Sequence, residues 1–197
     1  TLGYEYATGD WRVPPSLTGA RYLLRGSGAN WADVQAEVDL INAAGIGVPT
    51  IFRRKITVEE NDKKLMVNAL EEIKYIGAKS YERHEVLLAP WTLCQFDSAS
   101  GDHVVFPGNA STQVWDLYAS SENYRRCDGR QWEIATQGAD FRYQIATGAE
   151  VPWIQFNSPA RGLTVRRQAK PITQASGYID IADAPPSEPP STQGVKY

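Results

Sequence analysis

The chain has 197 residues and a formal net charge of −3, with apolar residues at 42% and charged residues at 22%. The apolar fraction is enough for a real core, and the charged fraction is normal for a soluble protein. The net charge offers no general attraction to phosphate backbones, which argues against nucleic acid as a partner. No apolar run approaches the roughly 20 residues that cross a bilayer, so we expect no membrane partner.

The first part of the chain predicts an extended arm. Residues 1–28 are rich in Gly, Pro, Tyr and Arg and show no sustained hydrophobic periodicity. Pro14 and Pro15 favour an extended backbone there. The side chains expected to make contacts from this arm are Tyr4, Tyr6, Trp11 and Arg12.

Two amphipathic helices are predicted next, near 31–44 and 58–76. The first has Asn30 as its N-cap and apolar residues at helical spacing. The second carries a possible capping box, formed by Thr57 and Glu60, ahead of an apolar stripe that starts at Leu65. We expect both apolar faces to pack on a sheet, with residues 48–56 forming a strand between them.

From residue 81 onward the hydrophobic period changes to two, which indicates β-strands. The expected strands are 83–89, 91–96, 103–107, 112–118, 130–136, 139–146, 151–157, 162–168 and 176–182. The predicted fold class is therefore α+β and β-dominated, an antiparallel sandwich or barrel with the two helices packed on it. Residues 29–184 are expected to form a single domain.

Residues 185–197 form a Pro- and Ser-rich tail that cannot bury enough apolar surface to offset its ordering entropy. An ordered tail would need a neighbouring subunit to hold it. The residues expected to make contacts there are Pro185, Pro186, Pro189, Pro190 and Tyr197.

The sequence contains no recognisable catalytic motif, and we predict no catalytic residue, no cofactor and no metal site. His84 and His103 each have a carboxylate neighbour, but successive strand residues point to opposite faces. Cys94 and Cys127 match no metal spacing, and free, buried thiols are favoured over a disulfide. The loop 97–102 is expected to be a plain hairpin loop rather than a calcium site.

Three arginine doublets stand out, at 53–54, 125–126 and 166–167. In a strand, one member of each doublet continues the apolar face, as Arg54 and Arg167 would. Such a guanidinium reaches the rim, finds a carboxylate or meets another chain. Arg54 and Arg167 are therefore candidate interface residues beside the alternative of rim residues.

Arms at both ends, a β-rich body and no catalytic constellation favour a structural assembly subunit whose partners are copies of itself or other subunits of a particle. This general character is similar to structural subunits of virions, including decoration, adaptor and tail components of tailed phages. One alternative is a β-sandwich module that binds carbohydrate or protein through exposed Trp and Tyr rings. Another is a hydrolase that uses carboxylate pairs such as Asp97 with Asp102 or Glu82 with Glu85.

Overall fold

A computed structural model describes residues 15–42, 44–82, 84–86, 88, 92–116, 119–136, 145–148 and 150–168, with the backbone of 195–196. Within these residues the protein is β-dominated, and its strands form three antiparallel sheets. Helical structure there is limited to α1 (Pro15–Thr18) and two single turns, η1 (Glu122–Tyr124) and η2 (Pro159–Arg161). None of the described helices has the length and apolar character to span a membrane. The chain divides into two compact units between residues 92 and 93.

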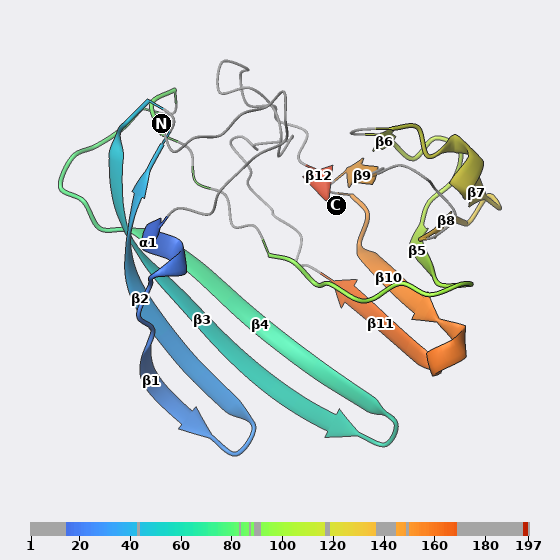
Figure 1. Cartoon of the computed structure of the whole chain (residues 1–197), viewed down its shortest axis with the longest axis horizontal. Coiled ribbons are helices and arrows are strands. Elements are labelled where there is room, and N and C mark those ends of the chain that lie inside the picture. The colour runs from blue at the N-terminus through green and yellow to red at the C-terminus, as the bar shows by residue number, and fades with distance from the viewer. Residues whose placement is uncertain are drawn as a thin grey trace. The chain divides into compact units, whose positions relative to one another are not determined.

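The first unit contains a four-stranded antiparallel sheet in which every strand pairs with its neighbour in the chain (Figure 1). Its strands are β1 (Leu23–Gly28), β2 (Trp31–Ile41), β3 (Gly47–Asn61) and β4 (Lys64–Tyr75). At 15 residues β3 is about 50 Å long, since a strand rises by about 3.4 Å per residue. The β3–β4 register runs without a break from Thr50 opposite Tyr75 to Asn61 opposite Lys64.

The two predicted amphipathic helices are wrong, because strands occupy both regions. Residues 31–41 form β2, and residues 58–76 contain the end of β3, a turn at Asp62 and Lys63, and all of β4. Asp62 has a φ of 49°, which the turn between the two strands requires. Thr57 and Glu60, expected as a capping box, lie inside β3. The predicted strand 48–56 is confirmed as part of β3.

The two faces of this sheet differ in the residues that they bury. On one face of β2 and β3 lie buried Ala36, Val38, Val48 and Thr50, and the Thr50 hydroxyl donates a 2.7 Å hydrogen bond to the Val38 carbonyl. Directly opposite residues share a face, and successive residues of a strand point to opposite faces. The residues that alternate with these therefore form a polar strip on the other face. The sheet is therefore best packed along its β2–β3 centre.

On the polar face, Arg53 binds Asp33 through a forked contact. The Arg53 Nε and Nη2 atoms lie 3.0 and 2.6 Å from the two carboxylate oxygens. The hydrogen bonds from Arg53 lower the pKa of the Asp33 carboxyl below its ordinary value, although burial acts in the opposite direction. This pair ties β2 to β3 at the middle of the sheet.

The second unit contains two further antiparallel sheets. A five-stranded sheet has the order β11 (Leu163–Gln168), β10 (Trp153–Ser158), β5 (His103–Pro107), β8 (Gln131–Ala135) and β7 (Arg125–Cys127). A three-stranded sheet has the order β12 (Val195–Lys196), β9 (Ile145–Gly148) and β6 (Val114–Asp116). Buried Phe106, Ile134 and Val151 form the core, and side chains of both sheets pack against it.

Several strands of this unit match the alternation of the sequence. Strands β5, β8, β10 and β11 confirm the predicted strands 103–107, 130–136, 151–157 and 162–168 within two residues. Residues 92–96 and the described part of 83–89 contain no strand, so those two predictions are wrong there. Most of 139–146 and all of 176–182 lie outside the described residues.

Candidate interaction surface

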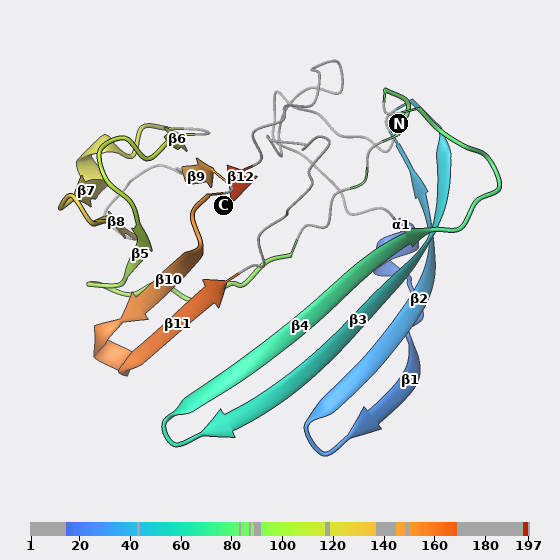
Figure 2. The same ribbon diagram turned by 180° about the vertical axis from the view of Figure 1, so that it is seen from behind.

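The β3–β4 hairpin extends beyond the rest of its sheet. Trp31, the first residue of β2, lies opposite Thr57, and the Val58 amide still donates a 2.8 Å hydrogen bond to the Asn30 carbonyl, so residues 59–61 of β3 pair with β4 alone. We call residues 58–67 the hairpin tip. Figure 2 shows the two long strands from behind, running side by side to their turn. A two-stranded ribbon has little stability of its own in water, so the loss of any contact in this tip should destabilise it.

Strand β4 exposes large apolar side chains in succession. Leu65, Met66, Val67 and Leu70 are 66, 56, 57 and 59% exposed. Leu65 and Val67 lie on one face of the sheet, and Met66 and Leu70 lie on the other. Single exposed apolar residues are common, but a group this dense on one strand makes β4 the candidate interaction surface of this unit.

Charges on the same hairpin are matched across its strands. Arg53 lies opposite Glu72 and Arg54 lies opposite Glu71. The Arg54 Nη2 atom is 2.5 Å from a Glu71 oxygen, whereas Arg53 Nη1 is 3.8 Å from Glu72 because Arg53 also binds Asp33. The Glu72 side chain stays half exposed and is available to a further cation.

The two edges of this sheet are built differently. Strand β1 has 6 residues, and its register with β2 shifts between Leu24 and Gly26. Short length and a bulge are features that discourage pairing with another chain. Strand β4 has 12 residues, no proline and no register shift. Among the described residues β4 pairs only with β3, which leaves its outer edge open.

In the second unit, most of the charged side chains described pair within the unit. Arg125 Nη1 lies 3.6 Å from Asp116 and the guanidinium covers the Trp132 ring. Arg166 donates hydrogen bonds of 3.0 and 2.8 Å to the Gln155 side-chain oxygen. These pairs favour a structural role for the doublets at 125–126 and 166–167.

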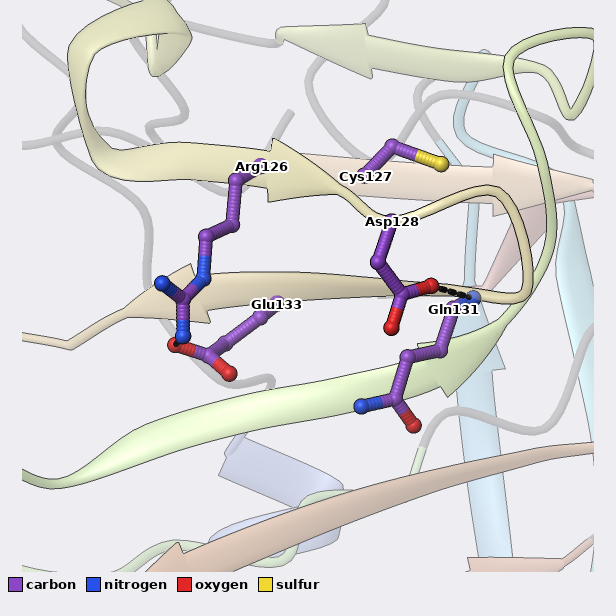
Figure 3. A pocket seen from close by; sticks show the side chains of 5 residues that line it. All are labelled: Arg126, Cys127, Asp128, Gln131 and Glu133. Atoms are coloured by element: carbon purple, nitrogen blue, oxygen red, sulfur yellow. Dashed lines mark hydrogen bonds and ion pairs between the residues drawn. The ribbon is translucent and has the colours of Figure 1, made fainter.

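A shallow hollow of about 280 Å³ lies beside β7 and β8 (Figure 3). Arg126 pairs with Glu133 at 2.7 Å across it. The Asp128 carboxylate accepts 2.8 Å hydrogen bonds from the amides of Arg130 and Gln131, and these amides lower its pKa. Both carboxylates that line the hollow thus have partners in the protein, and their role is to stabilise the β7–β8 turn.

Asp102 is buried at the base of the 97–102 loop. Burial raises the pKa of its carboxyl, but the Ser158 side chain, the Ala99 amide and the charge of Arg161 together hold it below the ordinary value. The Ala99 amide donates a 2.8 Å hydrogen bond to Asp102. The carboxylate therefore orders its loop, and its lowered pKa is the opposite of what a general acid needs. In the residues that the structure describes, no three His, Cys, Asp or Glu side chains gather as metal ligands.

The remaining residues that the sequence singled out are the two cysteines, the two candidate interface arginines and the contact residues of the arm and tail. Cys94 and Cys127 are both free thiols, as predicted, but Cys94 is exposed rather than buried. Arg54 lies in β3, on the same face as Phe52 and Ile56. Arg167 is exposed in β11. The arm and tail residues expected to make contacts lie outside the described residues: Tyr4, Tyr6, Trp11, Arg12, Pro185, Pro186, Pro189, Pro190 and Tyr197.

The apolar edge of β4 was missed by the sequence prediction, which assigned Leu65, Met66 and Ala69 to the buried stripe of a helix. The strand alternation of Leu65, Val67 and Ala69 was the available signal. Searches for similar proteins give no match to a family model, to a curated protein or to a solved structure.

Proposed function

We propose that this protein is a structural assembly subunit of a larger oligomeric particle of the virion type, such as a capsid decoration, adaptor or tail component of a phage. Its partners would be copies of itself or other subunits, joined in part by exchange of the arm and tail. The observation that carries the proposal is the run of exposed apolar side chains on the open edge of β4. An exposed, long, apolar edge strand is a template for pairing with another chain.

Further support comes from the way each unit is built. In the second unit, side chains from both sheets meet around Phe106, Ile134 and Val151, which favours a small sandwich. The first unit instead presents a long hairpin with half of its apolar residues uncovered. An uncovered apolar hairpin of this length suits a protein that acts by contact with other chains.

The carbohydrate-binding alternative has less support. Trp153 is half buried, and the guanidinium of Arg166 lies 4.1 Å from its ring centre. Trp132 has Arg125 in a similar place, at 5.7 Å. A ring face that already carries a cation is not free to stack on a sugar.

The hydrolase alternative also has less support. A hydrolase needs one carboxyl with a raised pKa to act as an acid. Hydrogen bonding to the Glu82 amide lowers the pKa of Glu85, and the pKa of Asp102 is also low. A lowered pKa does not suit Glu85 or Asp102 to the role of that acid.

The test is the mass of the full chain in solution, measured by light scattering over a concentration series. We expect a defined multimer that dissociates on dilution. A chain lacking residues 185–197 should keep its circular dichroism spectrum and associate more weakly. A full chain that stays monomeric at every concentration would refute the proposal, and a truncated chain that associates equally well would refute the role of the tail.

A further inference from the structure

We propose that two copies of this chain join edge to edge through β4, in antiparallel register about a two-fold axis at Asn68. The two four-stranded sheets then form one continuous sheet. This inference rests on the proposed assembly function and names the partner, a second copy, and the contact surface. It commits to residues 64–72 of each copy.

The geometry of the edge sets which registers are allowed. The β3–β4 turn closes with Asn61 opposite Lys64, and hydrogen-bonded pairs alternate along an antiparallel ladder. From Leu65 onward, every second residue of β4 therefore directs its N–H and C=O away from β3. Two copies of β4 satisfy these groups only if odd-numbered residues lie opposite odd-numbered ones. One residue of β4 then lies opposite its own copy, and the two-fold axis passes between these two copies.

Charge selects Asn68 among the central positions. With the axis at Asn68, Lys64 of each copy lies opposite Glu72 of the other. Moving the axis to Ala69 places Lys64 opposite Lys74, which is repulsive. Axes at Val67 or Leu70 bring no opposite charges together within β4. Glu72 has room for this pairing, because its side chain is half exposed and its contact with Arg53 is long, at 3.8 Å.

The same register covers three of the exposed apolar residues of β4, while Leu65 of each copy lies opposite Glu71 of the other. Met66 of each copy lies opposite Leu70 of the other on one face, and Val67 lies opposite Ala69 on the other face. All three of Met66, Val67 and Leu70 are more than half exposed in the single chain. A surface that complements itself in both charge and apolar contact is what a two-fold dimer requires.

The first test uses cysteine cross-linking in the full chain, with Cys94→Ser and Cys127→Ser as the background. In a pair that is not hydrogen-bonded, the two Cα atoms are about 4.5 Å apart, which a disulfide can span. Asn68→Cys should give a disulfide-linked dimer on mild oxidation. Leu70→Cys is the matched control on the same face of the same strand. Its yield should be about tenfold lower, because its own copy lies beyond disulfide reach.

The second test reverses the charges. Lys64→Glu places two carboxylate pairs opposite each other and should weaken dimerisation about tenfold. Glu72→Lys should weaken it to a similar degree. The double variant Lys64→Glu with Glu72→Lys should restore the original affinity. Lys63→Glu makes the same charge change in the turn, outside the overlap, and should have little effect.

The outcomes separate this inference from the proposed function. Cross-linking at position 68 with rescue by the charge swap supports both. A chain that forms multimers but cross-links best at another position of β4, or nowhere in β4, and ignores the charge variants overturns the Asn68 register while leaving assembly intact. A chain that is monomeric and gives no cross-link overturns both.

Discussion

Replacing Phe106 by alanine should destabilise the second unit far more than the same change at Phe96. Phe106 is 1% exposed and packs in the core with Ile134 and Val151. Removing a fully buried phenyl ring loses its transfer free energy and leaves a cavity, at a cost of about 3–5 kcal/mol. The loss should appear in β5 and in the two strands that pair with it, β8 and β10.

Phe96 is the matched control because it is 40% exposed. Its ring stacks on Phe156, with centroids 5.1 Å apart and planes 7° apart. Losing this stacking together with partial burial should cost roughly 1.5–2.5 kcal/mol. The difference of about 2 kcal/mol between the two variants corresponds to a shift of about 1 M in the urea midpoint.

The assay is hydrogen exchange followed peptide by peptide across a urea series, since it reports each unit separately. In the Phe106→Ala variant, we expect protection to fall in β5, β8 and β10 and to persist in β2 and β3. Equal losses for the two variants would refute the assignment of Phe106 to the core. A loss centred on β2 and β3 would refute the division of the chain into two units.

Three further changes test local features of the chain. Asp62→Gly should stabilise the hairpin by about 0.5 kcal/mol in thermal unfolding, because glycine adopts the positive φ at lower cost; a lower melting temperature would contradict this. Gly28→Ala should cost about 1–3 kcal/mol, since the added Cβ would overlap the Trp31 ring. Gly47→Ala, with no atom near its added Cβ, is the control. Backbone amides lower the pKa of the Asp128 carboxyl in the folded protein below its ordinary value of 3.8. The ionised carboxylate therefore stabilises the fold fully above the ordinary pKa, and this stabilisation is lost as the pH falls through the lower pKa of the folded protein. Asp128→Asn should therefore reduce the acid sensitivity of the urea midpoint, and an unchanged pH profile would contradict this.

The error at residues 58–76 has a physical cause. Glu, Lys, Leu, Met and Ala all favour helices, and Leu65, Ala69 and Ile73 fit helical spacing as well as strand alternation. Asp62 and Lys63 lack the glycine that usually announces a tight hairpin. Pairing with β3 along twelve residues of β4 overrides these local preferences.

A signal for the hairpin was nevertheless present in the order of the charges. The doublet at Arg53 and Arg54 and the doublet at Glu71 and Glu72 are symmetric about the turn at 62–63. Residues placed symmetrically about a hairpin turn lie opposite each other, so these doublets face one another in the sheet. The later strands were easier to predict because turn residues separate them and one of their faces is apolar, as at Phe106 and Ile134.

The candidate surface was hard to predict for a related reason. Apolar residues at 65–70 are expected to be buried, and the sequence does not distinguish burial within one chain from burial between two chains. The helix interpretation assigned these apolar residues to burial within one chain. On an edge strand with only β3 beside it among the described residues, Met66, Val67 and Leu70 are more than half exposed, and the proposed dimer is what would bury them. Arg54, by contrast, was a candidate for such a contact and has Glu71 as a partner inside its own hairpin. In the proposed dimer, the free energy of association would therefore come mainly from the apolar residues of β4, and the charges at Lys64 and Glu72 would select the register.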